Sequence, residues 1–285
     1  MNKIFASIIV LFILGCCYAE DYDVYPIDIT GKVLNEDGSL FLQKVEIKIW
    51  RTIVGMDEEG LYANHPTDVI STDTGTFSHS TTSNGHVTIS ANKEGFRSTE
   101  VGISDNEDRY DAKDILIYMI PKGASSRLIS TEYAYIPKPT DKESQGKLCG
   151  WSFNDRWYYP VDEREVDMSI GLTEKGNRIY KMKAPGGFIM HKGFRQFENK
   201  EEYIVDEIEY LTEAPENGYI TEIVPAKYPA TERGYRYAYF KTPDGLYGKI
   251  AFHGQVFDYY IQPDRLRNLE LGDEISRPAI PPEAR

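Results

Sequence analysis

The chain has 285 residues, of which 41% are apolar and 13% aromatic, so it can build hydrophobic cores and does not belong to the intrinsically disordered class. Its formal net charge of −13 argues against nucleic acid as a partner and against electrostatic docking on anionic lipid. Only Cys149 lies outside the first seventeen residues, which excludes a disulfide framework.

The N-terminal segment has the pattern of an export signal. Lys3 precedes an apolar run over residues 4–14, which is shorter than the roughly twenty residues needed to cross a bilayer and is typical of a signal peptide over 1–19. Cys17 and Ala19 are small residues at the positions that ordinary signal peptidase requires. The sequence Ile-Leu-Gly-Cys ending at Cys16 also resembles the lipobox of bacterial lipoproteins, although its leucine is bulkier than usual. The resemblance implies a lipid on Cys16 and a membrane-anchored envelope protein; simple secretion or release to the periplasm and an uncleaved anchor are the alternatives.

Residues 24–121 follow the two-residue period of half-buried β-strands. Apolar side chains alternate with polar ones in four separate stretches, and Asn-Glu-Asp-Gly38 and Ser-Asn-Gly85 are turn sequences between them. Short, regularly spaced strands of this kind favour an antiparallel β-sandwich. The alternating apolar positions are Ile27, Ile29 and Val33; Val45, Ile47 and Ile49; Val87, Ile89 and Ala91; and Ile115, Ile117 and Met119.

The order of motifs in this segment is similar to that of a known family. Gly31-Lys-Val33, the turn ending at Gly38, Thr72-Asp73 with Gly75-x-Phe77, and Gly95-Phe96 together resemble the carboxypeptidase regulatory-like domain of the transthyretin-like sandwiches. The turn at Asp73-Thr-Gly75 is a residue shorter than the family pattern, and the segment 51–68 is longer. The resemblance implies a non-catalytic accessory module of exported bacterial proteins, and the chain has no His-x-x-Glu zinc pair that would suggest peptidase chemistry.

The remainder predicts a linker and loop over 122–150, a second β-rich domain over 151–272, and a flexible tail over 273–285. The expected fold class is therefore all-β, with the transthyretin-like sandwich followed by the second β-rich domain. The order of motifs in this second part is similar to that of uncharacterised exported bacterial proteins, which adds no activity.

A hairpin is the clearest single element of the second part. The stretches 235–242 and 246–253 flank Pro-Asp-Gly245, a turn in which glycine accepts the positive φ. Pairing the two arms gives one apolar face and one face rich in tyrosine and lysine. That second face is either a stacking platform for a glycan, since tyrosine offers flat apolar area and a hydroxyl, or simply paired tyrosines on a partly covered sheet. The candidate ligand residues on it are Tyr235, Tyr237, Tyr239, Tyr247 and Lys249.

Catalytic and metal-binding motifs are missing from the sequence. It contains no nucleophile elbow, Walker loop, dinucleotide fingerprint or helical histidine pair, so we expect no catalytic residue, no metal and no cofactor. The predicted function is a non-catalytic binding or scaffolding protein of the cell envelope, with a glycan or an envelope protein as partner. Two alternatives stay open: a carbohydrate-binding module that uses the tyrosine face over 235–253, and a hydrolase whose carboxylates meet only in the folded chain.

Overall fold

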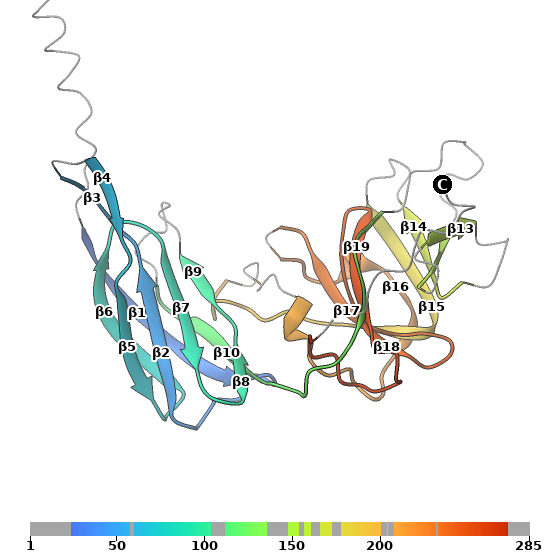
Figure 1. Cartoon of the computed structure of the whole chain (residues 1–285), viewed down its shortest axis with the longest axis horizontal. Coiled ribbons are helices and arrows are strands. Elements are labelled where there is room, and N and C mark those ends of the chain that lie inside the picture. The colour runs from blue at the N-terminus through green and yellow to red at the C-terminus, as the bar shows by residue number, and fades with distance from the viewer. Residues whose placement is uncertain are drawn as a thin grey trace, which may run out of the picture.

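The computed structural model describes residues 24–57, 60–103, 112–135, 148–153, 157–160, 166–172, 178–200, 204, 208–231 and 233–272. The described chain is almost entirely β-strand, which confirms the all-β prediction (Figure 1). Its two helical elements are single 3-10 turns, η1 (Ile208–Tyr210) and η2 (Pro225–Lys227).

Two four-stranded sheets make up most of the N-terminal half. They enclose one apolar core, so the arrangement is that of a sandwich. The alternation in the sequence explains this core, because Val45, Ile47 and Ile49 are at most 2% exposed while Lys48 between them faces solvent. One sheet has the order β6 (Thr76–Ser83), β1 (Tyr25–Asn35), β10 (Ile115–Pro121), β8 (Phe96–Ser98); the other has β5 (Thr67–Thr72), β2 (Val45–Arg51), β7 (Val87–Asn92), β9 (Val101–Ile103).

Two features of this half differ from the simple antiparallel expectation. Strands β1 and β10 pair in parallel, because the chain crosses through the other sheet before it returns beside β1. The long segment after β2 forms a separate hairpin, β3 (Ile53–Asp57) and β4 (Gly60–Asn64), which Asn84 holds through two hydrogen bonds to the backbone of Val54.

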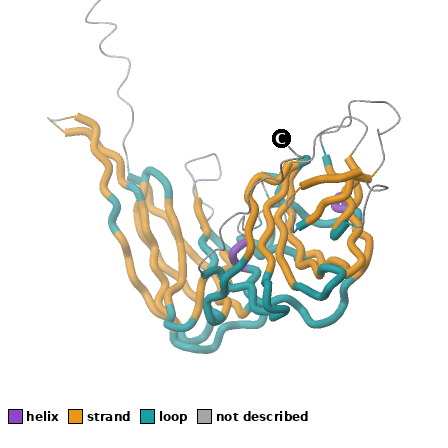
Figure 2. Tube along the Cα trace, turned by 45° about the vertical axis from the view of Figure 1, so that its right-hand side comes forward, coloured by secondary structure: helices purple, strands orange, loops and turns teal. Residues whose placement is uncertain are grey.

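The C-terminal half is one curved sheet of nine strands (Figure 2). The aromatic side chains of Trp151, Phe153, Phe240 and Tyr259 pack together in the core on one of its faces. Strand β11 lies within the range 122–150 that we expected to be linker and loop, and it pairs with β19. The strands are β11 (Ile129–Tyr135), β12 (Leu148–Ser152), β13 (Trp157–Pro160), β14 (Met168–Leu172), β15 (Ile179–Met190), β16 (Ile220–Ile223), β17 (Arg236–Lys241), β18 (Tyr247–His253) and β19 (Val256–Ile261).

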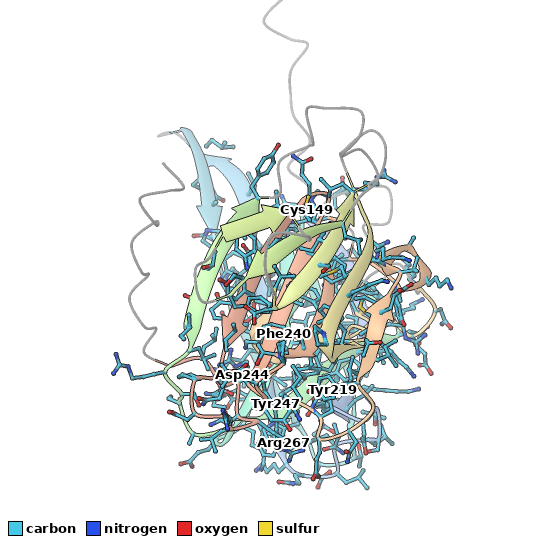
Figure 3. All side chains as sticks on the ribbon, turned by 90° about the vertical axis from the view of Figure 1, so that its right-hand side faces the viewer. Cys149, Tyr219, Phe240, Asp244, Tyr247 and Arg267 are labelled. Atoms are coloured by element: carbon cyan, nitrogen blue, oxygen red, sulfur yellow. The ribbon has the colours of Figure 1, made fainter. Side chains whose placement is uncertain are left out.

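The predicted hairpin is present as β17 and β18. Lys241 pairs with Tyr247 beside the turn, and Gly245 has a φ of +91°, as the turn sequence requires. The face that carries Phe240 and Ile250 lies in the core of the nine-stranded sheet, and Figure 3 shows Phe240 near its centre. The two faces therefore separate as the alternation predicts.

The two halves contact each other along β10. Its inner face packs into the sandwich, whereas Leu116, Tyr118 and Ile120 on its outer face pack against Phe194 and Tyr210 from the C-terminal half. This explains why the run Ile115–Ile120 is apolar at every position. Figure 1 shows the halves joined at the end of the molecule where β8 and β10 lie.

Polar contacts and one shared core residue reinforce this joint. Lys32 forms an ion pair of 2.7 Å with Glu198, and Arg97 pairs with both Glu209 and Glu270. Phe197 from the C-terminal half enters the core of the N-terminal sandwich. The proposed boundaries 24–121 and 151–272 stay a prediction, because side chains from both ranges build the same joint.

Candidate functional site

A cleft of about 900 Å³ lies beside this joint. The turn after β1 supplies Glu36 and Asp37, and β10 supplies Tyr118. The opposite wall comes from the C-terminal half, from the end of β15 through Arg195 and from the segments around residues 213–215 and 267. Its volume falls within the range of roughly 300–1,000 Å³ of ordinary ligand pockets.

The charged side chains around this cleft balance each other. Among the described residues that line it, the acidic ones are Glu36, Asp37 and Glu213, and the basic ones are Lys192, Arg195 and Arg267. Glu213 and Arg267 form an ion pair, with 2.5 Å between Oε1 and Nη2. The chain as a whole is acidic, with a net charge of −13, so the cleft differs from the rest of the protein in its equal numbers of acidic and basic residues. Hydrogen-bond donors and acceptors therefore occur together in it.

His191 contributes a neutral imidazole to the cleft. Its Nδ1 accepts a hydrogen bond of 3.1 Å from the backbone N–H of Gly193, so the ring proton resides on Nε2. Burial lowers the pKa of His191 to about 4, because the charged form would lose its hydration. The rings of Phe194 and Tyr239 lie 4.9 Å and 6.2 Å from the imidazole and provide the apolar surroundings.

The two carboxyls of the turn after β1 differ in acidity. Partial burial against the cleft wall raises the pKa of Glu36, and the nearby charges of Glu213 and Asp37 raise it further. Hydrogen bonds from the hydroxyl and the N–H of Ser39 lower the pKa of Asp37. The turn therefore presents one carboxyl that holds its proton more tightly and one that is readily ionised.

The tyrosine face of the hairpin is covered, so of the two interpretations of this face the structure favours paired tyrosines on a covered sheet over an open stacking platform. Tyr237 and Tyr239 are 6% and 4% exposed, and Lys249 is fully buried. The cover consists of four apolar side chains from segments distant in the sequence, and an external ligand would have to displace them: Leu128, Leu211, Ala214 and Leu269.

The other two tyrosines of the hairpin are partly buried near its ends. Tyr235 contacts the ring of His253, and Tyr247 lies 6.2 Å from the ring of Tyr219. Figure 3 shows Tyr219, Tyr247 and Arg267 at the same end of the sheet. Of the five predicted ligand residues, Tyr239 lines the large cleft, while Tyr235 and Tyr237 line a separate hollow of about 350 Å³.

Lys249 has a structural role instead of a solvent-facing one. Its Nζ donates a hydrogen bond of 3.1 Å to the carbonyl oxygen of Leu211 and lies 5.5 Å from the ring centre of Tyr260. Burial lowers the pKa of Lys249 to about 7, an effect that Glu270 opposes and Arg97 assists. The side chain thus fastens the covering segment at Leu211 to the sheet.

Some of the other sequence-based predictions concern residues that the structure describes, and some concern residues outside the described ranges. Cys16 and the rest of the leader lie outside them, as does the tail 273–285. Cys149 is a half-buried free thiol whose pKa is raised by burial. Within the described ranges, no group of three His, Cys, Asp or Glu side chains could hold a metal ion. No helix in the part of the chain that the structure describes has the length and apolar character for a membrane crossing.

The charged residues of the cleft were missed at the level of the sequence. Glu36 belongs to the turn sequence Asn-Glu-Asp-Gly38, and the need for a tight turn accounts for this sequence without any ligand. Glu213 and His191 lie in segments with no recognisable pattern. The folded chain brings residues 36 and 213 to one cleft, and no local sequence pattern predicts that residues so far apart in the sequence line the same site. The apolar outer face of β10 was the one usable hint, because it required a covering partner.

Comparisons of the chain with protein-family models, with curated proteins and with solved structures find no match. The resemblance of residues 31–96 to the carboxypeptidase regulatory-like domain therefore stays a sequence-based prediction. What the structure defines is the class: an all-β protein in which a sandwich and a larger curved sheet border one polar cleft.

Proposed function

We propose that this chain is an exported, non-catalytic binding protein that holds an uncharged, hydroxyl-rich ligand such as an oligosaccharide in the cleft beside β10. The balanced charge of the cleft carries the proposal. Carboxylates accept hydrogen bonds from hydroxyl groups and guanidinium groups donate to them, so paired acids and bases suit a neutral polar ligand better than an ion.

The construction of the cleft also supports binding. Tyr118, Phe194 and Tyr239 are buried side chains at its base, and their packing fixes the polar residues around them. The two walls come from the two halves, which the ion pair between Lys32 and Glu198 and the aromatic contact between Tyr118 and Phe194 hold together. Such a preformed cleft lowers the cost of ordering a site on binding.

The leader supplies the location in this proposal. A lipid on Cys16 would place the protein on the membrane surface of the cell envelope, and residues 17–24 would serve as a short tether. The membrane is then a partner only through that lipid, which agrees with the acidic composition of the chain.

A glycan array tests this function directly. The purified chain without its leader, fluorescently labelled at its N-terminal amine, should bind a defined set of neutral oligosaccharides. Glu213→Gln should lower the signal because it removes an acceptor and breaks the pair with Arg267, whereas Glu216→Gln, an exposed glutamate outside the cleft, should leave it unchanged. A blank array would remove the oligosaccharide as ligand.

One observation favours a hydrolase as the second candidate. Glu36 has a raised pKa and lies near Glu213, and glycosidases commonly use two carboxyls, one of which has a raised pKa and acts as the general acid. An array-positive oligosaccharide incubated with the protein should then yield new reducing ends, and Glu36→Gln should abolish their release. Binding without release of reducing ends would leave the non-catalytic function standing alone.

A further inference from the structure

A smaller pocket of the C-terminal half shares no lining residue with the cleft. It has a volume of about 340 Å³ and forms where the start of β15, the turn after β18 and the segment around η2 meet. Two arginines and a histidine, Arg178, Arg236 and His253, line it together with apolar side chains. A hydrogen bond of 2.7 Å from the N–H of Ile179 to the carbonyl oxygen of Gly254 fixes two of its walls.

The charge of this pocket is opposite to that of the chain. The net charge of the protein is −13, yet no carboxylate occurs among the described residues that line the pocket. Elsewhere in the described chain Arg51, Arg97 and Arg267 each form an ion pair with Asp or Glu. Arg178 and Arg236 have no carboxylate partner there. Two guanidinium groups that share one hollow without a counter-ion are the usual basis of an anion site.

The guanidinium group of Arg236 is held in place by the backbone. Its Nε donates to the carbonyl oxygen of Tyr228 at 3.1 Å, and Nη1 approaches that of Gly234 at 3.4 Å. Burial lowers the pKa of Arg236, and the positive charge of Arg178 lowers it further. An anion between the two side chains would oppose this shift of the pKa, because a nearby negative charge favours the charged guanidinium.

Gly234 allows the histidine to approach the pocket. The residue has a φ of +85°, and a Cβ added to it would lie 2.9 Å from Cδ2 of His253. A glycine at this position therefore leaves room for the imidazole at the wall of the pocket, beside the two arginines.

We propose that this pocket binds a small organic anion, whose carboxylate or phosphate group lies between Arg178 and Arg236 and whose apolar body packs against Ala226 and Ala230. The apolar part of the wall favours an organic anion over a bare inorganic ion, because the accessible side chains of Ala226 and Ala230 offer contact area that an ion alone cannot use. This site is independent of the neutral cleft and of the ligand proposed for it.

Calorimetric titration of the protein with three aromatic probes tests the site: phenyl phosphate, benzoate and uncharged phenol. We expect one molecule of phenyl phosphate or benzoate to bind per chain, more weakly at high salt, and phenol not to bind. Phenyl phosphate should also bind more tightly than inorganic phosphate. A preference between the two anionic probes identifies the head group.

Two charge-reversal variants distinguish binding in this pocket from a general effect of the protein's net charge on anion binding. Arg178→Glu should weaken binding of the anionic probe at least tenfold, while Arg127→Glu, an equally exposed arginine outside the pocket, should change it less than twofold. Both side chains are exposed, so both variants should melt at the wild-type temperature. Absence of binding by either anion, equal losses in the two variants, or equal affinities for phenol and phenyl phosphate would overturn the proposal.

Discussion

The aromatic rings of Tyr118 and Phe194 lie with their centroids 5.0 Å apart, and this contact joins the N-terminal sandwich to the C-terminal sheet. Both residues also line the cleft, so the contact that fixes the relative position of the two halves fixes the walls of the site as well. Stability and binding are therefore coupled at this position.

Phe194→Ala tests the joint. The side chain is 5% exposed, and its loss leaves a cavity between Tyr118 and Tyr210. We expect the free energy of unfolding to fall by about 3 kcal/mol, as is typical for truncation of a buried phenylalanine. Chemical denaturation measures it, with Leu61→Ala on the exposed hairpin β3–β4 as the control that should change little. Equal effects of the two changes would mean that the joint contributes nothing.

Lys249→Met should change how stability depends on pH. The pKa of Lys249 is about 7 in the folded chain and near 10.5 when unfolded, so the unfolded chain binds more protons between these values. Wild-type stability should therefore rise by up to about 1.4 kcal/mol per pH unit above pH 7 relative to Lys249→Met. Denaturation series at pH 6, 7, 8 and 9 measure the difference, and parallel curves for the two proteins would contradict the burial of a charged amine.

His191→Gln should change how stability depends on pH below neutrality. The pKa of His191 falls from 6.5 to about 4 on folding, so the unfolded chain again binds more protons between these values. Its contribution to stability is complete above pH 6.5 and is lost as the pH falls toward 4, where protonation of Nδ1 also breaks its hydrogen bond with Gly193. Thermal melts between pH 4 and 7 should show a shallower decline for the variant, and equal slopes for the two proteins would contradict the burial of a neutral imidazole at this position.

The sequence predicted the strands better than their surroundings. The alternation of apolar and polar residues predicted β2, β7 and the β17–β18 hairpin, because every second side chain of a strand with one buried face is apolar. It could not say that the tyrosine face of that hairpin is covered, since the cover comes from Leu128, Leu211 and Leu269. Tyrosine and lysine suit a solvated face and a covered one equally well, as the buried Lys249 demonstrates.

The candidate site was beyond the reach of local patterns for a related reason. Glu36 and Glu213 meet only because β10 has an apolar outer face that draws the C-terminal half onto the sandwich. Arg178 and Arg236 likewise come together only in the folded chain, because the start of β15 is hydrogen-bonded to the turn after β18 and β18 pairs with β17 at Arg236. Individual charges of this kind are common in an acidic protein, and only their position in the fold distinguishes them.

Cys16→Ser tests the anchor. If Cys16 carries the lipid, cells grown with radioactive palmitate should label the wild-type protein and not the variant, and the variant should leave the membrane fraction. Cys17→Ser is the matched control and should stay labelled. An unlabelled wild-type protein would instead favour cleavage after Ala19 and simple secretion.

Calorimetry with the best oligosaccharide from the array tests the proposal that the cleft beside β10 binds a neutral, hydroxyl-rich ligand. We expect one binding site per chain, an affinity that changes little with salt, and a loss of at least tenfold in Glu213→Gln but not in Glu216→Gln. Equal affinities of the wild-type protein and Glu213→Gln would contradict it, because the ligand would then bind outside the cleft.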